Sequence, residues 1–147
     1  MTLVQARSRP ATALDALPRP PCAELLGWQV AVARPADGWI RIAFEARREF
    51  TNPAGFVQGG FLAAMLDDTM GPAVFAHTEG RLYCPTIDLH VSFLSPAKPG
   101  RLYGEGQVVQ LGRRIGFVEA KLMTPEGEVV ARASASCRLV EAAKALG

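Results

Sequence analysis

The segment 59–76 most constrains what this chain can fold into, because it is one long apolar helical stretch set among segments with strand periodicity. Gly59 and Gly60 open it, and it is expected to end near Ala76. The residues that recur on one face of such a helix are Phe61, Leu62, Met65, Leu66 and Thr69. This apolar stripe predicts a helix that is buried against the rest of the protein.

Most of the remaining chain has the composition or period of strands, interrupted by short turn signals such as Asp37-Gly38. Strict alternation over 86–93 predicts a half-buried strand with Leu89 on its apolar face and Thr86 on its polar face. The predicted strands are 28–33, 39–46, 86–93, 102–110, 116–123 and 128–140, and a short helix closed by Gly27 is predicted at 21–26.

Two strands, one helix and four strands predict an α+β fold in which an antiparallel sheet wraps around one long central helix. Gly104 and Gly106 are two residues apart on one strand face, where they would let the helix lie close to the sheet. The length of 147 residues fits one domain. We expect residues 21–147 to form it and residues 1–20, rich in Pro, Ala and Arg, to form a flexible N-terminal arm.

Composition argues against several classes of partner. Sixteen basic and 14 acidic residues give a net charge of +2 without a basic run, so we expect no nucleic acid partner. No apolar run has the length of a membrane span, so we expect no membrane association. The three cysteines, Cys22, Cys84 and Cys137, lack C-x-x-C spacing. We therefore expect a reducing cytoplasmic location and no metal site.

The loop 52–60 delivers the N-terminus of the predicted helix. The first N–H groups of a helix have no intrahelical acceptor, and with the helix dipole they favour an anion or a developing oxyanion. Gly59 and Gly60 would let a substrate approach the backbone closely, and Asp67, two turns later, would supply a base or nucleophile. Paired glycines also make plain turns, and Asp68 competes with Asp67 for the same role, so the residues alone leave both assignments open.

A family pattern runs through this region: an Asn, a Gly three residues on, then His-Gly-Gly, and an Asp nine residues after the His. The matching positions are Asn52, Gly55, Gly59, Gly60 and Asp67. Further matches are Ser95-Pro96-Ala97 with Gly100, and Gly112-Arg113. From Gly27 to Leu139 the chain thus resembles the hotdog-fold acyl-CoA thioesterases of the PaaI-like type, related to phenylacetic acid degradation and to 4-hydroxybenzoyl-CoA thioesterases. It departs from them at Gln58, where the family usually has His.

The resemblance implies hydrolysis of an acyl-CoA thioester, without metal or cofactor, in sites shared between two subunits. The Gly60 N–H and the Gln58 side chain would polarise the thioester carbonyl, while Asp67 would activate water or attack directly. Asn52 would orient the loop or Gln58. Thr86 matches a position where the family often has a Ser or Thr that positions the water.

Substrate contacts follow from the same resemblance. Gly59 and Phe61 would border the substrate, and Arg113 and Arg114 would hold CoA phosphates through charge-assisted hydrogen bonds. The helix residues Phe61, Met65, Met70 and Phe75 favour a pocket for a medium-chain or aromatic acyl group, although they would serve equally as core.

Helix geometry adds an argument for a dimer. Gly60 and Asp67 are seven residues apart, so they share a helix face but are separated by about 10 Å along the axis. An antiparallel helix of a second subunit would bring Asp67 of one chain to Gly60 of the other. We therefore expect a symmetric homodimer with shared active sites, and the family resemblance implies that two dimers pair into a tetramer.

Two alternatives remain, and Gln58 keeps the first of them open. Glutamine can donate a hydrogen bond as histidine does, but it cannot take up a proton near neutral pH. The chain could therefore be an acyl-CoA-binding protein without turnover. A hotdog enoyl-thioester hydratase or dehydratase would normally pair a His with an acidic residue, and no His precedes His77 in the loop or the helix.

Overall fold

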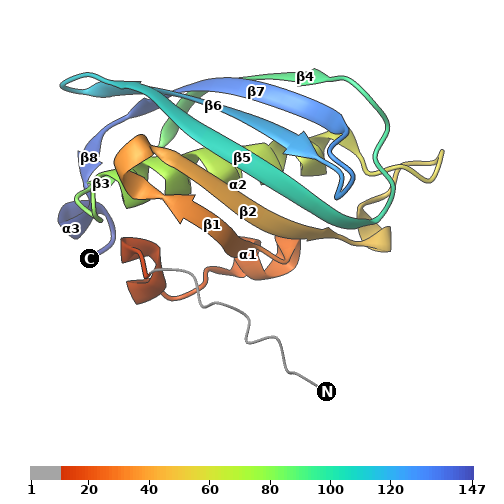
Figure 1. The fold of residues 1–147 in the computed structure, drawn as a ribbon, viewed down its shortest axis with the longest axis horizontal. Coiled ribbons are helices and arrows are strands. Elements are labelled where there is room, and N and C mark those ends of the chain that lie inside the picture. Colours follow the sequence, from red (N-terminus) through yellow and green to blue (C-terminus); the bar gives the residue numbers. More distant parts are fainter. Residues whose placement is uncertain (1–10) are drawn as a thin grey trace.

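The computed structural model describes residues 11–147 as a six-stranded antiparallel sheet, in the order β1-β2-β5-β6-β7-β4, with the helix α2 (Gly59–His77) packed along it (Figure 1). The strands are β1 (Gln29–Arg34), β2 (Trp39–Ala46), β4 (Thr86–Phe93), β5 (Gly100–Leu111), β6 (Ile115–Met123) and β7 (Val129–Arg138). The predicted α+β architecture, an antiparallel sheet around one long helix, is confirmed.

Short elements complete the chain. The helices are α1 (Pro21–Leu26) and α3 (Ala142–Ala145), and 3-10 turns lie at Ala13–Ala16, Pro35–Asp37 and Arg48–Phe50. Gly27 closes α1 in the left-handed conformation, with φ of 65°, as the sequence predicted.

The prediction of one last strand over 128–140 is wrong at its end. The strand β7 stops at Arg138, and Val140–Glu141 forms a separate strand, β8, that pairs with β3 (Leu82–Tyr83). Two-residue strands are too short to have a visible period, so β3 escaped the sequence analysis. This small sheet ties the C-terminal segment to the chain just after α2.

The N-terminal segment is only partly described. Residues 1–10, half of the arm expected over residues 1–20, lie outside the described residues. Within the other half, Thr12 and Asp15 form a capping box on the turn Ala13–Ala16, and Leu14 packs against the core. The division of the chain into an arm and a domain stays a prediction.

Glycines on β5 allow the close packing of α2 on the sheet. A Cβ at Gly104 would collide with the Thr69 hydroxyl, and one at Gly106 would lie 3.0 Å from the Thr69 carbonyl oxygen. Thr69 is fully buried, and its hydroxyl donates to the Met65 carbonyl at 2.8 Å. The close approach predicted from these two glycines is therefore confirmed.

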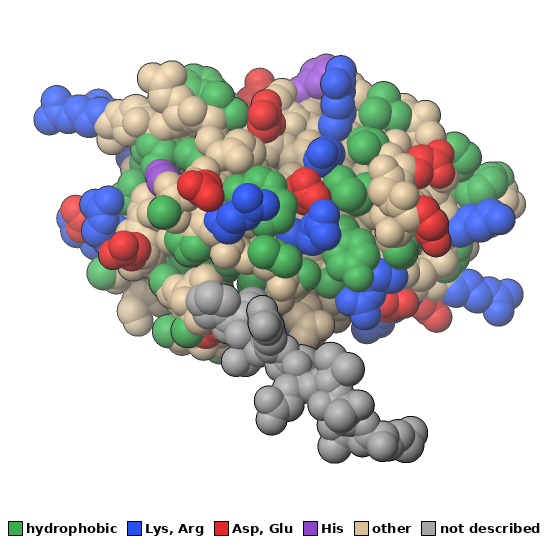
Figure 2. Space-filling model, in the orientation of Figure 1, with side chains coloured by type: hydrophobic (Ala, Val, Ile, Leu, Met, Phe, Trp, Pro, Cys, Tyr) green, Lys and Arg blue, Asp and Glu red, His purple; other side chains and the backbone are tan. Residues whose placement is uncertain are grey.

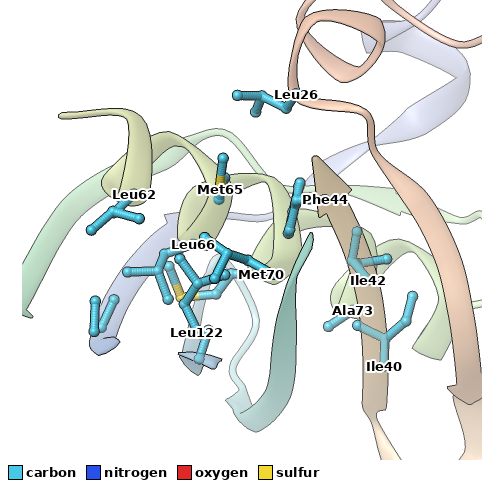
Figure 3. Packing of buried hydrophobic residues seen from close by; sticks show 14 of the residues in the cluster. Leu26, Ile40, Ile42, Phe44, Leu62, Met65, Leu66, Met70, Ala73 and Leu122 are labelled. Carbon is cyan, nitrogen blue, oxygen red and sulfur yellow. The ribbon is translucent and has the colours of Figure 1, made fainter. Parts of the chain in front are cut away.

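The core fills the space between α2 and the sheet. Figure 3 shows Met65, Leu66 and Met70 of α2 packed with Phe44 of β2 and Leu122 of β6. These side chains are at most 3% exposed, which is the environment predicted for the apolar stripe of the helix. The outer surface differs: Figure 2 shows basic and acidic side chains interspersed on the face that it presents.

A proline inside α2 explains an unusual contact of the helix. Pro72 has no N–H to donate, so the carbonyl of Asp68, four residues earlier, lacks its helical partner. The indole N–H of Trp28 donates to this carbonyl at 2.9 Å. The segment before β1 is thereby fixed to the middle of α2, next to the predicted site.

Candidate functional site

The loop before α2 is built around Asn52. Its side-chain oxygen accepts hydrogen bonds from the N–H groups of Ala54 at 3.0 Å and Phe56 at 3.2 Å, and its own N–H donates to the Phe56 carbonyl at 2.7 Å. Gly55 turns the chain with φ of 84°. Of the two roles predicted for Asn52, these contacts correspond to orienting the loop.

The first turn of α2 leaves donors free for a ligand. Gln58 is the N-cap residue, and its carbonyl accepts from Phe61 and Leu62 at 2.9 and 3.3 Å. Its side chain is exposed and makes no capping bond. Within residues 11–147, no acceptor is seen for the N–H groups of Gly59 and Gly60. The helix start thus has the character of an oxyanion site.

Asp67 and Thr86 are brought together. The Thr86 hydroxyl donates to the Asp67 carboxylate at 2.7 Å, and both side chains are exposed. The two residues come from different elements, the middle of α2 and the first position of β4. A carboxylate beside a hydroxyl in an accessible position can take a proton from water or attack an electrophile.

A β-bulge brings Thr86 to Asp67, and it places Thr86 on a different face of β4 from the one predicted. The pairing of β4 with β7 shifts register between Thr86 and Asp88, so Asp88 lies opposite Ser136 while Thr86 lies opposite the buried Cys137. The extra residue turns Thr86 away from the polar face that strict alternation gave it and toward α2. The sequence has no signal for the bulge.

Asp68 has a different environment from Asp67. One of its carboxyl oxygens is buried and has no hydrogen-bond partner among the described residues. Burial, and secondarily the charge of Asp67, raise the pKa of Asp68 to about 7. The exposed, hydroxyl-bonded Asp67 therefore suits a catalytic role better than Asp68 does, and its assignment as the catalytic residue stays a prediction.

Other predicted site residues lie apart from this pair within one chain. Gly60 is exposed, and it lies about 10 Å from Asp67 along the helix axis. Arg113 and Arg114 are exposed at the turn between β5 and β6, and the Arg114 carbonyl accepts from Leu139 at 2.7 Å. The turn thus lies beside the end of β7, where Cys137 pairs with Thr86.

An apolar hollow of about 330 Å³ lies beside the start of α2. Its lining residues are Asn52, Phe56, Val57, Gly59, Leu62, Phe93, Leu94, Ser95, Pro96 and Ala97. The ring of Phe93 lies so close to Gly59 that a Cβ there would be 3.1 Å from it. The sequence analysis named Asn52 and Gly59 for the site and Ser95-Pro96-Ala97 only as a family match. It did not place the end of β4 beside the helix start, because no periodicity links a strand end to a distant loop.

The helix residues considered for the acyl pocket lie elsewhere. Met65, Met70 and Phe75 are at most 7% exposed and belong to the core rather than to the hollow. Phe61 is half-buried and stacks on Phe50, with ring centroids 4.2 Å apart. The sequence left open whether these residues line an acyl pocket or form the core, and the three buried side chains form the core.

No three His, Cys, Asp or Glu side chains gather closely enough to hold a metal ion within residues 11–147. No helix in that same part of the chain is long and apolar enough to cross a membrane.

Comparison with known proteins identifies the family. The family model described as the thioesterase superfamily matches residues 54–131, which include the first turn of α2, Asp67 and Thr86. The chain belongs to the thioesterase superfamily. The predicted relation to PaaI-like hotdog thioesterases is thereby confirmed, and it agrees with the solved structures that this thioesterase-superfamily chain resembles.

A phenylacetic acid degradation-related protein from Ralstonia eutropha is 36% identical, with a TM-score of 0.80, over 86% of this chain and 95% of that one. A thioesterase family protein from Silicibacter pomeroyi is 26% identical, with a TM-score of 0.77, over 88% and 96%. A Streptococcus pneumoniae thioesterase structure with coenzyme A, 21% identical with a TM-score of 0.70 over 78% and 86%, shares the fold.

A Halobacterium salinarum protein provisionally named an esterase is 34% identical over 101 residues, which are 65% of this chain and 66% of that protein. The match therefore spans just under two thirds of this curated relative's length.

Proposed function

We propose that this thioesterase-superfamily protein hydrolyses an acyl-CoA thioester to a free acid and CoA, with Asp67 as its base or nucleophile. The observation that carries the proposal is the 2.7 Å hydrogen bond between Thr86 and Asp67 on an accessible face of the central helix. Family membership makes thioester hydrolysis the expected chemistry. The coenzyme A held by the Streptococcus pneumoniae thioesterase supports CoA as the leaving group.

The reaction needs two groups that the helix supplies at different points. The carbonyl oxygen of the thioester accepts from the Gly60 N–H, with the Gln58 side chain as a second donor. Asp67 removes a proton from a water held by Thr86, and the hydroxide adds to the carbonyl carbon. The C–S bond then breaks, and the proton on Asp67 passes to the departing CoA thiolate. In the alternative route, the Asp67 carboxylate adds first and water hydrolyses the resulting anhydride.

Assembly into a homodimer would complete this site. The edge strand β4 has an unpaired side and exposed apolar side chains, with Ile87 59% and Phe93 55% exposed. An exposed apolar edge strand is a surface suited to pairing with a second copy. Since Gly60 and Asp67 of one chain are too far apart to act on one carbonyl, each site would take Gly60 from one subunit and Asp67 from the other. Pairing of two such dimers into a tetramer remains part of the proposal.

The apolar hollow beside Gly59 favours a medium-chain or aromatic acyl group. Its walls include the side chains of Phe56, Leu62 and Phe93, and it lies at the helix start where the carbonyl would bind. Arg113 and Arg114 are exposed and have no ion-pair partner within the described residues, so they are available for CoA phosphates. The cytoplasmic location stays a prediction.

The first experiment measures CoA release from short, medium and long aliphatic and from aromatic acyl-CoAs. Asp67→Asn should abolish turnover without changing folding. Gly60→Pro removes the proposed oxyanion donor, and proline is tolerated in a first helical turn. Gly60→Ala is its matched control, because it keeps the N–H and open space surrounds that position. We expect Gly60→Pro to lower kcat by about a hundredfold or more, as for loss of an oxyanion donor, and Gly60→Ala to remain active.

A mixing experiment tests the shared site. Gly60→Pro and Asp67→Asn chains are unfolded together and refolded as a mixture. In a mixed dimer with shared sites, one site has both defects and the other has none, so about a quarter of the native activity should return for random pairing of an isologous dimer. Sites confined to one chain would recover nothing. Saturable acyl-CoA binding without turnover would instead indicate a binding protein.

A further inference from the structure

The ring of Phe93 is a wall of the apolar hollow, and it reaches the start of α2. A Cβ at Gly59 would lie 3.1 Å from the Cζ atom at the tip of this ring, and 3.2 and 3.5 Å from its two Cε atoms. The ring therefore points end-on at the Gly59 backbone and closes the gap between the end of β4 and the helix. Glycine allows this approach, because a Cβ so close would crowd the ring.

The backbone that carries Phe93 is held firmly, whereas the side chain is accessible. Phe93 pairs with Ala131 at the last rung of the β4–β7 ladder. The next two N–H groups, those of Leu94 and Ser95, donate to one carbonyl at 2.9 and 3.2 Å. That carbonyl belongs to Val130, which is fully buried. Phe93 itself is 55% exposed, so its side chain can be changed while the strand end stays in place.

This wall stands beside the carbonyl of the proposed substrate. The thioester oxygen is proposed to accept from the Gly60 N–H, and the Cα atoms of neighbouring residues are about 3.8 Å apart. The ring against Gly59 is thus about one residue away from the bound carbonyl. Space at Gly60 is open, since a Cβ there would have no neighbour within 4 Å. Phe93 therefore restricts the acyl group from the Gly59 side, next to the reacting carbon.

We propose that Phe93 is a specificity-determining residue, whose ring limits the bulk of the acyl group at the carbon next to the thioester carbonyl. Because the carbonyl must bind at the helix start, this role rests on the proposed function. A straight chain or a flat aromatic group can lie along the face of the ring, whereas a branch at that carbon meets the ring. Turning the ring out would expose apolar surface of the hollow to water, which is unfavourable.

A pair of substrates isolates this effect. The first is the acyl-CoA that the native chain hydrolyses best among those with a CH₂ group next to the carbonyl. The second carries one additional methyl group on that carbon. One methyl group that does not fit an apolar pocket costs about 10- to 200-fold in kcat/KM. We expect the ratio of kcat/KM for the branched to the straight substrate to rise at least about tenfold in Phe93→Ala, and less in Phe93→Leu.

Ile87→Ala is the matched control. Ile87 lies on the same edge strand and is 59% exposed, close to the 55% of Phe93, but it is not among the residues that line the hollow. Both truncations would weaken a dimer formed through β4, whereas only Phe93→Ala should change the ratio. Both substrates meet the same enzyme sample, so the ratio does not depend on how much of a variant is folded or assembled. The intrinsic reactivities of the two thioesters cancel when variants are compared.

Steady-state assays of CoA release measure the ratio. An unchanged ratio in both Phe93 variants, or an equal rise in Ile87→Ala, overturns the role of Phe93 and leaves the proposed function standing. Failure of the proposed function has a different result, namely no hydrolysis of any acyl-CoA in the panel.

If neither substrate of a pair is hydrolysed, isothermal titration calorimetry replaces the kinetic assay. Butanoyl-CoA and 2-methylbutanoyl-CoA then serve as the probes, and the ratio of their dissociation constants is compared among the same variants. A ratio that shifts toward the branched probe in Phe93→Ala, and not in Ile87→Ala, supports the role of Phe93 in binding. An unchanged ratio, or no binding of either probe, overturns it.

Discussion

Asp68 provides the sharpest quantitative test of the structure. This carboxyl has a buried oxygen without a partner among the described residues and lies next to Asp67, and its pKa is raised from 3.8 to about 7, first by burial and then by the charge of Asp67. A carboxyl that is hard to ionise in the folded protein makes the folding free energy depend on pH. Replacing it by the uncharged Asn removes that dependence while keeping nearly the same shape.

The sign and the size follow from the two pKa values. Between pH 4 and pH 7 the folded state keeps the Asp68 proton that the unfolded chain has lost, so stability falls as pH rises through this range. A difference of about three pKa units corresponds to about 4 kcal/mol, at 1.36 kcal/mol per unit, as an upper estimate. Between pH 5 and pH 8, we expect the free energy of unfolding of Asp68→Asn to rise by about 3 kcal/mol relative to that of the native chain.

Urea unfolding at pH 5 and pH 8, followed by circular dichroism at one protein concentration, measures this gain. Asp88→Asn controls for the loss of one negative charge, because that side chain is exposed on β4. Equal stability differences between Asp68→Asn and the native chain at the two pH values would refute the reasoning. That result would mean that the folded protein does not hold the Asp68 carboxyl in its protonated form.

Two further predictions concern the contacts of α2. Thr86→Ala should lower kcat up to about a hundredfold by releasing Asp67, whereas Thr86→Ser keeps the hydroxyl and should retain most of the native kcat. Steady-state kinetics measures both values, and an equal loss in the two variants would contradict the hydrogen-bond role of Thr86. Gly104→Ala should lower the free energy of unfolding by about 1–3 kcal/mol through overpacking against Thr69. Gly71→Ala, in open space on the helix, should not lower it, and urea titration would expose the reasoning as wrong if both variants lost the same amount.

Most of the fold could be predicted because its signals are local. The period of the stripe that includes Met65 and Leu66 specified the buried helix, and the spacing of Gly104 and Gly106 indicated which strand it approaches closely. The β3–β8 pairing could not be predicted, because each partner has only two residues and the contact joins segments more than 50 residues apart. The order of the strands in the sheet is likewise a product of tertiary packing.

The site was predictable by residue type and spacing, but its geometry was not. Asp67 and Thr86 were each named from family spacing, whereas alternation in β4 placed Thr86 on the wrong face. The contact between them depends on one extra residue in the ladder, and a bulge leaves the composition of a strand unchanged. The apolar hollow beside Gly59 is lined by a loop and by the end of β4, so no single segment of the sequence has a pattern that predicts it.

Two adjacent carboxyls on one helix acquire different chemistry from their surroundings alone. Asp67 is exposed and accepts from Thr86, a contact that suits a carboxylate, whereas burial of Asp68 opposes its ionisation. The main chain of Asp68 is also distinctive, because Pro72 leaves its carbonyl without a helical donor and the Trp28 indole N–H donates to it instead. Below about pH 7 Asp68 therefore adds no negative charge to the helix. For the acyl-CoA substrate proposed above, which carries negative phosphates, a charge on Asp68 would be repulsive, so its burial would favour binding while lowering stability at higher pH.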